Sequence, residues 1–165
     1  MRIDIRAAVQ TDIADITAVL DASWRDTYSD ILSEEQTALY TGENRISAIQ
    51  RLLLKNTDIF VLLIDGEISA VCVADDCDEK GFYGYVCIQS LCVLPELKRR
   101  GLGRKLLNHT LRKMREKGYR YAVLDVVEHN VAARLFYEKI GFTAVKTDTS
   151  KEFDNITRVI YKIEL

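Results

Sequence analysis

The spacing of apolar residues at the start of the chain predicts a strand followed by a helix. Residues 2–9 have the pattern of a short strand. Apolar residues then recur every three or four positions from Ile13 to Trp24, which is the period of an amphipathic helix. We expect Thr11 to cap this helix and Asp12 to lie in its first turn, where the helix dipole favours an anion.

A second helical stretch follows and is interrupted once. It begins near Ser33, because Glu35 and Gln36 suit the first turn of a helix. The helical period breaks at Thr41 and Gly42 and then resumes as far as Leu54. The chain therefore opens with one strand and a series of helices.

The central part of the chain predicts an antiparallel meander. The dipeptide Asp65-Gly66 separates two short β-rich runs and is a favoured type I′ hairpin turn. A polar loop at 75–81 then precedes a third run, which Pro95 ends. The predicted strands are 59–64, 68–74 and 82–94.

The last third of the chain alternates between helix and strand. A helical period begins at Gly101 and stops at Gly118, and Gly141 closes a second, shorter helix over 131–140. The predicted strands are 121–127, 142–146 and 156–163, and a polar loop at 148–154 joins the last two. The order strand, helix, strand across 85–127 implies a right-handed crossover and one parallel pair. We therefore predict a mixed α/β sheet with helices on both faces, in a single domain over 1–165.

Composition narrows the class of protein. The 165 residues are 48% hydrophobic and 29% charged, which is typical of a soluble globular domain. The net charge of −2 does not suit a surface built for nucleic acid or for an anionic membrane. The apolar run at 59–64 is far shorter than a membrane span, and the first residues lack the apolar core of a signal peptide. We expect a cytoplasmic protein without a nucleic-acid or membrane partner.

The cysteines are expected to be reduced thiols, most of them in apolar surroundings. Their spacing does not match a zinc site, and the two histidines, His109 and His129, are not placed to complete one. We therefore expect no metal. The four cysteines are Cys72, Cys77, Cys87 and Cys92.

The segment 91–107 has the composition of an anion-binding turn. A strand ends there, a basic turn with two glycines follows, and a helix begins. The first amides of a helix have no intrahelical acceptors, and with the helix dipole they attract phosphate. Gly101 and Gly103 remove side chains that would hold a phosphate away from those amides. Residues 98–120 also contain ten basic residues and one acid, Glu116.

Several classes of protein use such a turn. A dinucleotide-binding fold requires G-x-G-x-x-G, but Leu106 stands at the third glycine position, although Asp125 lies at a suitable distance to contact a ribose. A P-loop is excluded because its lysine-containing motif is absent. A nucleic-acid patch at 98–105 lacks interleaved aromatic residues. A plain helix start with a solvated basic face also fits the turn taken alone.

A second motif follows 27 residues after Gly103. It runs from Asn130 to Phe142 with the letters NVAARLFYEKIGF. Asn130 is a good N-cap, and Tyr137 stands two helical turns after it on the same face. Taken alone, the two residues would be a cap and a core aromatic residue.

With both motifs present, the chain resembles the GNAT superfamily of acyl-CoA N-acyltransferases. Residues 98–103 match that family's pyrophosphate loop, Q/R-x-x-G-x-G/A, except that Lys98 replaces glutamine or arginine. Residues 127–142 resemble the family's N-x-x-A-x-x-F-Y-E-K-x-G-F segment almost letter for letter. The resemblance implies a mostly antiparallel sheet with one parallel pair, splayed where acetyl-CoA binds.

The resemblance also implies roles for individual residues. Backbone groups of the strand before the loop would bind the pantetheine arm, the loop would bind the pyrophosphate, and Asn130 and Phe136 would contact the arm. Tyr137 would donate a proton to the departing thiolate. The implied cofactor-binding residues are Leu91, Cys92, Val93, Lys98, Arg99, Arg100, Gly101, Leu102, Gly103, Arg104, Lys105, Asn130, Ala133, Phe136 and Tyr137.

The general base and the acceptor are left open by the sequence. Cys87 stands where many members of this family carry a glutamate, with Gln89 two residues further on. Asp125, Glu128 or a water-mediated route remains for proton removal. Trp24 and Tyr28 lie where the family places acceptor-binding helices.

Two readings of the function follow. The first is an N-acetyltransferase that acts on a small amine, a polyamine or a protein amine, as a monomer or a homodimer. The second is a non-catalytic module that binds acyl-CoA for regulation. A dinucleotide-dependent oxidoreductase is a more distant alternative.

Overall fold

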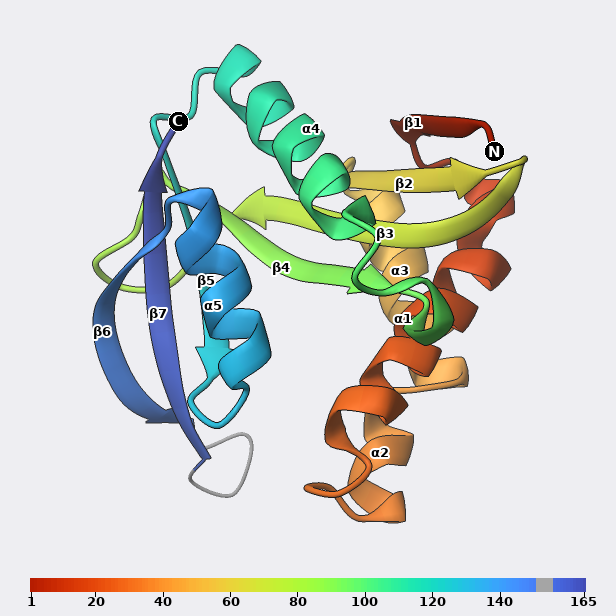
Figure 1. Cartoon of the computed structure of the whole chain (residues 1–165), viewed down its shortest axis with the longest axis horizontal. Helices are drawn as coiled ribbons and strands as arrows, with labels where there is room; N and C mark the ends of the chain where they lie inside the picture. The colour runs from red at the N-terminus through yellow and green to blue at the C-terminus, as the bar shows by residue number, and fades with distance from the viewer. Residues whose placement is uncertain (151–155) are drawn as a thin grey trace. The chain divides into compact units, whose positions relative to one another are not determined.

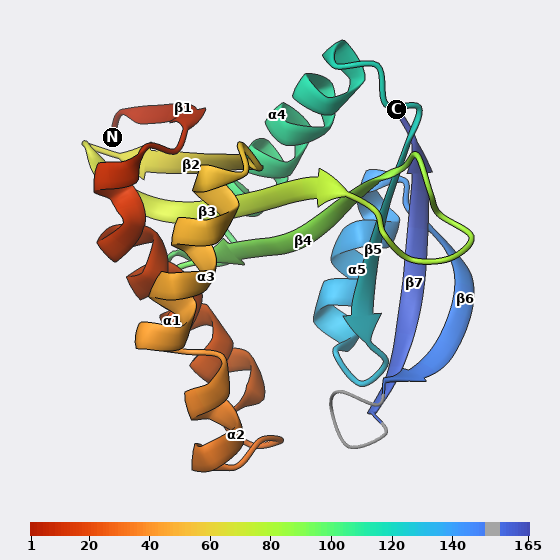
Figure 2. The same ribbon diagram turned by 180° about the vertical axis from the view of Figure 1, so that it is seen from behind.

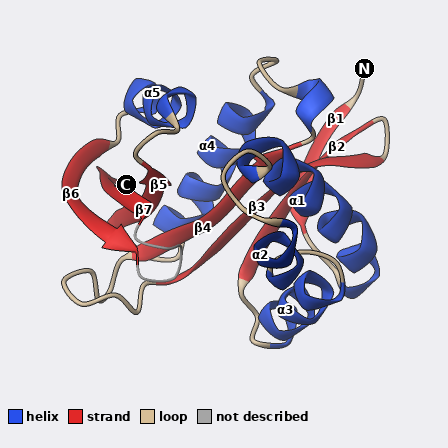
Figure 3. Ribbon diagram, turned by 90° about the horizontal axis from the view of Figure 1, so that it is seen from below, coloured by secondary structure: helices blue, strands red, loops and turns tan. Residues whose placement is uncertain are grey.

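The computed structural model describes residues 1–150 and 156–165. These residues form a seven-stranded sheet in the order β1-β2-β3-β4-β5-β7-β6 (Figures 1 and 3). The strands are β1 (Ile3–Ala7), β2 (Asp58–Ile64), β3 (Glu67–Asp76), β4 (Val86–Val93), β5 (Tyr121–Val127), β6 (Thr143–Ser150) and β7 (Ile156–Glu164). The helices are α1 (Ile13–Tyr28), α2 (Glu34–Leu39), α3 (Glu43–Leu54), α4 (Leu102–Glu116) and α5 (Val131–Ile140).

The sheet has the predicted mixture of strand directions. β4 and β5 pair in parallel, through Val86 with Ala122 and Cys87 with Val123. The pairs β1–β2, β2–β3, β5–β7 and β7–β6 are antiparallel. The predicted mixed α/β class with one parallel pair is confirmed.

The chain divides into two compact units that are interleaved in the sequence. Unit 1 comprises Met1–Ala74 and Gln89–Thr110, and unit 2 comprises Asp75–Ile88 and Leu111–Leu165. Strand β4 and helix α4 contribute residues to both units. The single domain expected over 1–165 stays a prediction.

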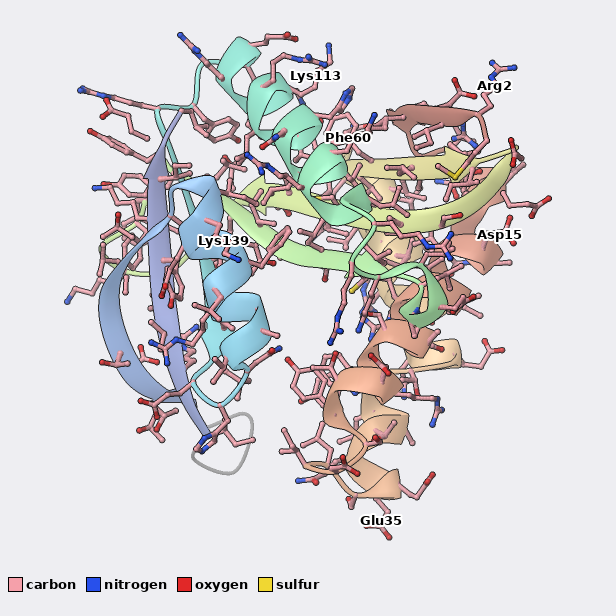
Figure 4. The ribbon with its side chains drawn as sticks, viewed as in Figure 1. Arg2, Asp15, Glu35, Phe60, Lys113 and Lys139 are labelled. Atoms are coloured by element: carbon pink, nitrogen blue, oxygen red, sulfur yellow. The ribbon has the colours of Figure 1, made fainter. Side chains whose placement is uncertain are left out.

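Unit 1 has helices on both faces of its strands. Helices α1 and α3 cover one face of β2 and β3 (Figure 2), and the first half of α4 lies on the opposite face (Figure 1). Phe60 of β2 lies beneath α4 and meets the ring of His109 edge-on at 5.2 Å (Figure 4). The core on the α1 side consists of Ile16, Val19, Leu20, Ile49, Ile59, Val61, Ile68, Val71 and Val73.

The start of α1 differs from the prediction. A 3-10 turn over Gln10–Asp12 precedes the helix, so Thr11 lies inside that turn and does not cap α1. The Asp12 carboxylate accepts the Val9 N–H at 2.8 Å. The Arg6 guanidinium of β1 holds that carboxylate through two hydrogen bonds of 2.7 and 3.0 Å. These bonds stabilise the 3-10 turn that contains Thr11, and α1 starts after it without a side-chain cap.

The second helical stretch is confirmed as two helices with the predicted break. Ser33 caps α2 by accepting the Gln36 N–H, and the Gln36 side chain accepts the Ser33 N–H in return. Gly42 has a φ of 59° and is the N-cap residue directly before α3. The Gly42 N–H donates to the Asp21 carboxylate of α1 at 2.8 Å, and this hydrogen bond links the segment between α2 and α3 to α1.

The hairpin is confirmed, whereas the third strand of the meander begins later than predicted. Asp65 and Gly66 both have positive φ, of 50° and 94°, as a type I′ turn requires. The sequence pattern predicts the third strand from residue 82, but it begins at Val86. Gly81 and Gly84 have φ of 98° and 85° and bend the segment between them out of extended geometry.

Unit 2 packs α5 against one face of its β5–β7–β6 strands (Figures 1 and 2). Gly118 has a φ of 99° just after α4, and Gly141 has a φ of 118° just after α5, as expected of glycines that end helices. The polar loop expected over 148–154 is wrong at its start, because β6 continues to Ser150. Asp148 is part of that strand, and residues 151–155 lie outside the described residues.

Among the described residues, none of the helices combines the length and the apolar character needed to cross a membrane.

Candidate functional site

The basic turn before α4 is built from a sharp change in backbone direction. Strand β4 ends at Val93, and a 3-10 turn over Pro95–Leu97 follows. The Leu94 N–H donates to the Ser69 carbonyl of β3 at 3.0 Å, and the Leu97 N–H donates back to the Leu94 carbonyl at 2.9 Å. These bonds fix the point at which the chain leaves the sheet.

The backbone of this turn enters the left-handed region twice. Arg99 and Gly101 have φ of 64° and 77°. A turn of this kind directly before a helix is a common place for backbone amides to bind an anion. The Lys105 N–H closes the first turn of α4 on the Gly101 carbonyl at 3.0 Å. The amides before Lys105 therefore have no acceptor within the helix.

The side chains of the turn divide into an exposed and a buried set. Arg99, Arg100, Arg104 and Lys105 are exposed, as an anion-binding role requires. Leu102 is only 3% exposed and anchors the helix in the core. Gly103 lies in the first turn of α4 and is half-buried. A bound anion can therefore reach the Leu102 backbone but not its side chain.

Lys98 has a partner that the sequence did not indicate. Its Nζ lies 2.5 Å from Oδ2 of Asp26 on α1. Both side chains are partly exposed, and they join the basic turn to the C-terminal end of α1 within unit 1. Lysine at this position therefore connects two elements of unit 1, in addition to its contribution to the charge of the turn.

The end of the strand before the turn contains three residues expected to bind the coenzyme. Leu91, Cys92 and Val93 are half-buried in β4. Cys92 packs against the core under α1, and its thiol hydrogen-bonds with Ser23 of that helix. Burial raises the pKa of this thiol, so it is a neutral packing group.

Trp24 and Tyr28 belong to an aromatic cluster on the helices of unit 1. The Trp24 ring lies 4.5 Å from the Tyr28 ring and stacks on Tyr40 at 5.1 Å. The Arg45 guanidinium lies 5.3 Å from the centre of the Trp24 ring, and its Nε is 3.3 Å from the Asp21 carboxylate. Sequence reasoning missed Tyr40 and Arg45, because their proximity to Trp24 arises from the packing of α2 and α3 and has no local sequence signal.

Asn130 caps α5 as predicted. Its Oδ1 accepts the Ala133 N–H at 3.2 Å, which satisfies one of the free amides of the first turn. Ala133 is half-buried at this point.

Tyr137 and Phe136 stand in a row of aromatic rings along α5. The Phe136 and Tyr137 rings meet edge-on at 5.1 Å, and Tyr137 meets Phe142 edge-on at 5.7 Å. Phe142 is 3% exposed and is the buried end of this row. Tyr137 itself is half-buried, so its phenol is supported by neighbouring rings without being enclosed in the core.

The two acids proposed from the sequence have different environments. Asp125 Oδ2 lies 3.5 Å from Nη1 of Arg158, and the aspartate side chain is about half exposed. Glu128 is exposed, and its backbone is fixed by a hydrogen bond from its N–H to the Thr157 carbonyl at 2.9 Å.

Arg158 is the centre of an ionic network that sequence reasoning missed. It donates to Asp148 at 2.6 Å and to Glu79 at 3.0 Å, in addition to its contact with Asp125. The hydrogen bond from Arg158 holds the pKa of Asp148 below its ordinary value. The alternation of charges along β6 and β7 was visible in the sequence, but the participation of Glu79 from the loop after β3 was not.

Cys87 is a buried thiol near acidic groups. Burial raises its pKa to about 12, and the nearby Cys77 and Asp125 act in the same direction. A thiol with such a pKa stays protonated near neutral pH and does not remove a proton from an amine. All four cysteines are free thiols, as expected. Among the residues that the structure describes, no set of three or more histidine, cysteine or acidic side chains is arranged to hold a metal ion.

Comparison with known proteins identifies a family. The model of the Acetyltransferase (GNAT) family matches residues 16–142. The ribosomal protein bS18-alanine N-acetyltransferase of Salmonella typhimurium is 40% identical over 53 residues, which cover 32% of this chain. The chain spans 36% of the length of that curated relative.

Solved structures share the fold at lower identity. The PaiA N-acetyltransferase of Thermoplasma acidophilum, crystallised in complex with coenzyme A, has a TM-score of 0.79 at 24% identity, with 100% of both chains covered. The ribosomal-protein-S18-alanine N-acetyltransferase of Escherichia coli has a TM-score of 0.69 at 20% identity, with 99% of this chain and 94% of that chain covered.

Proposed function

Because the chain belongs to the GNAT acetyltransferase family, we propose that it transfers the acetyl group of acetyl-CoA to an amine. The observation that carries this proposal is the basic turn with positive φ at Arg99 and Gly101, directly before α4. Such a turn suits a diphosphate, because backbone amides and cationic side chains act on the same anion.

In this proposal the turn holds the pyrophosphate of the coenzyme. Hydrogen bonds to a charged group contribute roughly 1.5–3 kcal/mol each, so a few converging amides would dominate the affinity. The backbone of residues 91–93 lies beyond the two residue pairs that join β4 to β5, and it would bind the pantetheine arm in the manner of a neighbouring strand. Asn130 would contribute its amide group and Phe136 its ring.

The chemical step is a direct attack of the amine on the thioester. An amine with a pKa near ~10.4 is almost entirely protonated at neutral pH, so a proton must leave before the attack. The nitrogen then forms a bond with the acetyl carbon, the carbonyl oxygen takes up negative charge, and the carbon–sulfur bond breaks. Tyr137 would donate its phenolic proton to the leaving sulfur, which departs as the thiol. The nitrogen loses a second proton as it becomes a neutral amide, and this proton would return to the phenolate, whereas the proton lost before the attack goes to water.

We favour a water-mediated route for the proton that the amine loses. Cys87 stays protonated at neutral pH, as its raised pKa requires. The Asp125 carboxylate is engaged in an ion pair, with its Oδ2 3.5 Å from Nη1 of Arg158. Glu128 is exposed to solvent.

The acceptor is proposed only by chemical class, as a small amine, a polyamine or a protein amine. The Salmonella typhimurium relative named above is an N-acetyltransferase for an alanine of ribosomal protein bS18, and its sequence similarity to this chain covers 53 residues. A non-catalytic module that binds acyl-CoA remains the second candidate, because the position of the usual glutamate is occupied by Cys87.

A thiol-release assay with acetyl-CoA and a panel of amines, polyamines and peptides tests the proposal. The module would bind acetyl-CoA without releasing thiol above the rate seen without protein. If the enzyme is active, we expect Tyr137→Phe to lower kcat by roughly 10²-fold, because general acids contribute about that much or more. The affinity for acetyl-CoA, measured by calorimetry, should change little.

Tyr83→Phe is the matched control, since Tyr83 is 68% exposed in the loop between β3 and β4. It removes the same phenolic oxygen and should leave kcat at the wild-type value. If Tyr137→Phe and Tyr83→Phe have the same kcat, Tyr137 is not the proton donor.

A further inference from the structure

A fully buried tyrosine connects β7 to the helix that carries Tyr137. Tyr161 has no exposed surface, and its ring belongs to the core of unit 2. Its hydroxyl donates to Oε1 of Glu138 at 2.8 Å and accepts from Nε of Arg134 at 3.0 Å. The one polar atom of this side chain is therefore satisfied by two groups of α5.

The two partners lie one turn apart on the same face of α5. Arg134 and Glu138 are four residues apart, so their side chains project in nearly the same direction. The hydrogen bonds run in one direction, from the guanidinium to the phenol and from the phenol to the carboxylate. Each bond has a charged member, which makes it stronger and more directional than a bond between neutral groups.

The same arginine fixes the segment that leads into the helix. Nη1 of Arg134 donates to the Glu128 carbonyl at 3.3 Å. The Glu128 N–H in turn donates to the Thr157 carbonyl of β7 at 2.9 Å. Hydrogen bonds therefore link both the segment before α5 and the middle of α5 to β7.

These contacts oppose a rotation of α5 about its own axis, because they hold two of its side chains to fixed positions. Tyr137 directly precedes Glu138, so a rotation that moves the carboxylate also moves the phenol. The Tyr137 carbonyl accepts from the Gly141 and Phe142 amides at 3.2 and 3.1 Å, which ties its backbone to the end of the helix. The Glu138 bond to Tyr161 fixes the same turn from the side of the sheet.

We infer that Tyr161 is a positioning residue for acetyl transfer, because its hydroxyl sets the orientation of α5 and through it the phenol of Tyr137. This inference rests on the proposed function. It also gives a role to Arg134 and Glu138 of the segment NVAARLFYEKIGF, whose side chains form hydrogen bonds with the Tyr161 hydroxyl of β7. Displacement of a reacting group by about 1 Å can lower a rate by 10²-fold, so a lost hydrogen bond at this place has a kinetic effect.

The test compares Tyr161→Phe with Ile160→Val. The first variant removes the hydroxyl and keeps the ring, and the second removes one methyl group from the neighbouring buried residue of β7 without touching α5 hydrogen bonds. We expect Tyr161→Phe to lower kcat by about 10-fold. Ile160→Val should keep the wild-type kcat, even if its melting temperature falls as much as that of Tyr161→Phe.

Two substitutions of Glu138 separate the effect of its hydrogen bond to Tyr161 from the effect of its negative charge. Glu138→Gln keeps an oxygen that accepts the Tyr161 hydroxyl, whereas Glu138→Ala removes it. We expect Glu138→Gln to retain a larger share of kcat than Glu138→Ala, and Glu138→Ala to match Tyr161→Phe. Equal kcat values for Tyr161→Phe and the wild type would overturn the inference.

Amide hydrogen exchange gives a readout that does not depend on activity. Residues 131–140 should exchange faster in Tyr161→Phe than in Ile160→Val, because only the former removes hydrogen bonds that link α5 to β7. A wild-type protein that acetylates nothing would refute the proposed function, whereas unchanged exchange in Tyr161→Phe would refute the anchoring role of the hydroxyl. The two failures are therefore distinguishable.

Discussion

The substitution Gly101→Ala tests whether the backbone conformation of the basic turn serves anion binding. Gly101 has a φ of 77°, and a Cβ built at this position meets no heavy atom within 4 Å. The added methyl group therefore causes no collision. Its effect comes from the left-handed conformation, which L-residues other than glycine adopt at a cost of roughly 1–2 kcal/mol.

The measured effect depends on whether the strain is present in the free protein or arises only when the coenzyme binds. If the turn relaxes to negative φ in the free protein, binding of the coenzyme must restore the strained conformation. The strain then appears as weaker affinity, and 1–2 kcal/mol corresponds to a Kd raised by roughly 5- to 30-fold. If the turn stays strained in the free protein, the same energy appears as lower stability. We expect the first outcome to dominate, because the exposed turn is free to relax.

Gly118→Ala is the matched control. Gly118 has a φ of 99° and also has open space where a Cβ would be added, but it lies after the C-terminal end of α4, away from the basic turn. Both variants carry one strained alanine. Gly118→Ala should lower the melting temperature by roughly 2–4 °C for each kcal/mol of strain and leave the Kd unchanged.

Calorimetric titration with coenzyme A at fixed ionic strength measures the affinities, and thermal unfolding measures the stabilities. Ionic strength must be constant because the cationic side chains of the turn contribute to binding. Equal Kd values of Gly101→Ala and Gly118→Ala for coenzyme A would contradict this prediction. The positive φ at Gly101 would then have no role in holding the anion.

Two further predictions concern groups with shifted pKa values. The hydrogen bonds from Arg6 lower the pKa of Asp12, so the charged carboxylate stabilises the fold above the ordinary aspartate pKa and this stability is lost as the pH falls below about 4. The difference in melting temperature between the wild type and Asp12→Asn should therefore be largest near neutral pH and shrink toward pH 2, and a constant difference would contradict the role of the ion pair. Burial raises the pKa of Cys72 and of Cys87 to about 12, so peptide mapping after brief treatment with iodoacetamide at pH 8 should find both alkylated at least about 10²-fold more slowly than in the unfolded protein. Rapid native alkylation at either cysteine would show that its thiol is more accessible than the structure indicates.

The elements could be predicted from the sequence wherever the signal is local. The capping pair Ser33 and Gln36 and the turn Asp65-Gly66 determine their own geometry, because each satisfies its hydrogen bonds or its φ within a few residues. The same holds for Asn130, whose side chain reaches an amide three residues away. These are the positions at which the prediction and the structure agree.

The predictions were wrong where a distant group decides the local structure. Thr11 does not cap α1, since it lies in a 3-10 turn whose Asp12 carboxylate is bound by Arg6 of β1. The third strand of the meander starts at Val86 because two successive glycine turns shape the preceding loop.

In the candidate site too, features with a local signal could be predicted from the sequence, whereas contacts between distant residues could not. Its backbone features follow from the glycines and the capping asparagine, so the turn before α4 and the start of α5 could be predicted. The partner of Lys98 is Asp26, 72 residues earlier in the chain, and the partners of Tyr161 lie 23 and 27 residues before it. No periodicity relates such pairs, and only the folded chain brings them together.

The interleaving of the two units constrains how the molecule can be made. Neither unit is a continuous stretch of sequence, since unit 1 needs residues 89–110 and unit 2 needs residues 75–88. During synthesis the ribosome must release residue 110 before unit 1 has all its strands and its share of α4. A nascent chain stalled earlier would expose the apolar faces of β2 and β3 to chaperones, and no single cut in the gene separates one unit intact from the other.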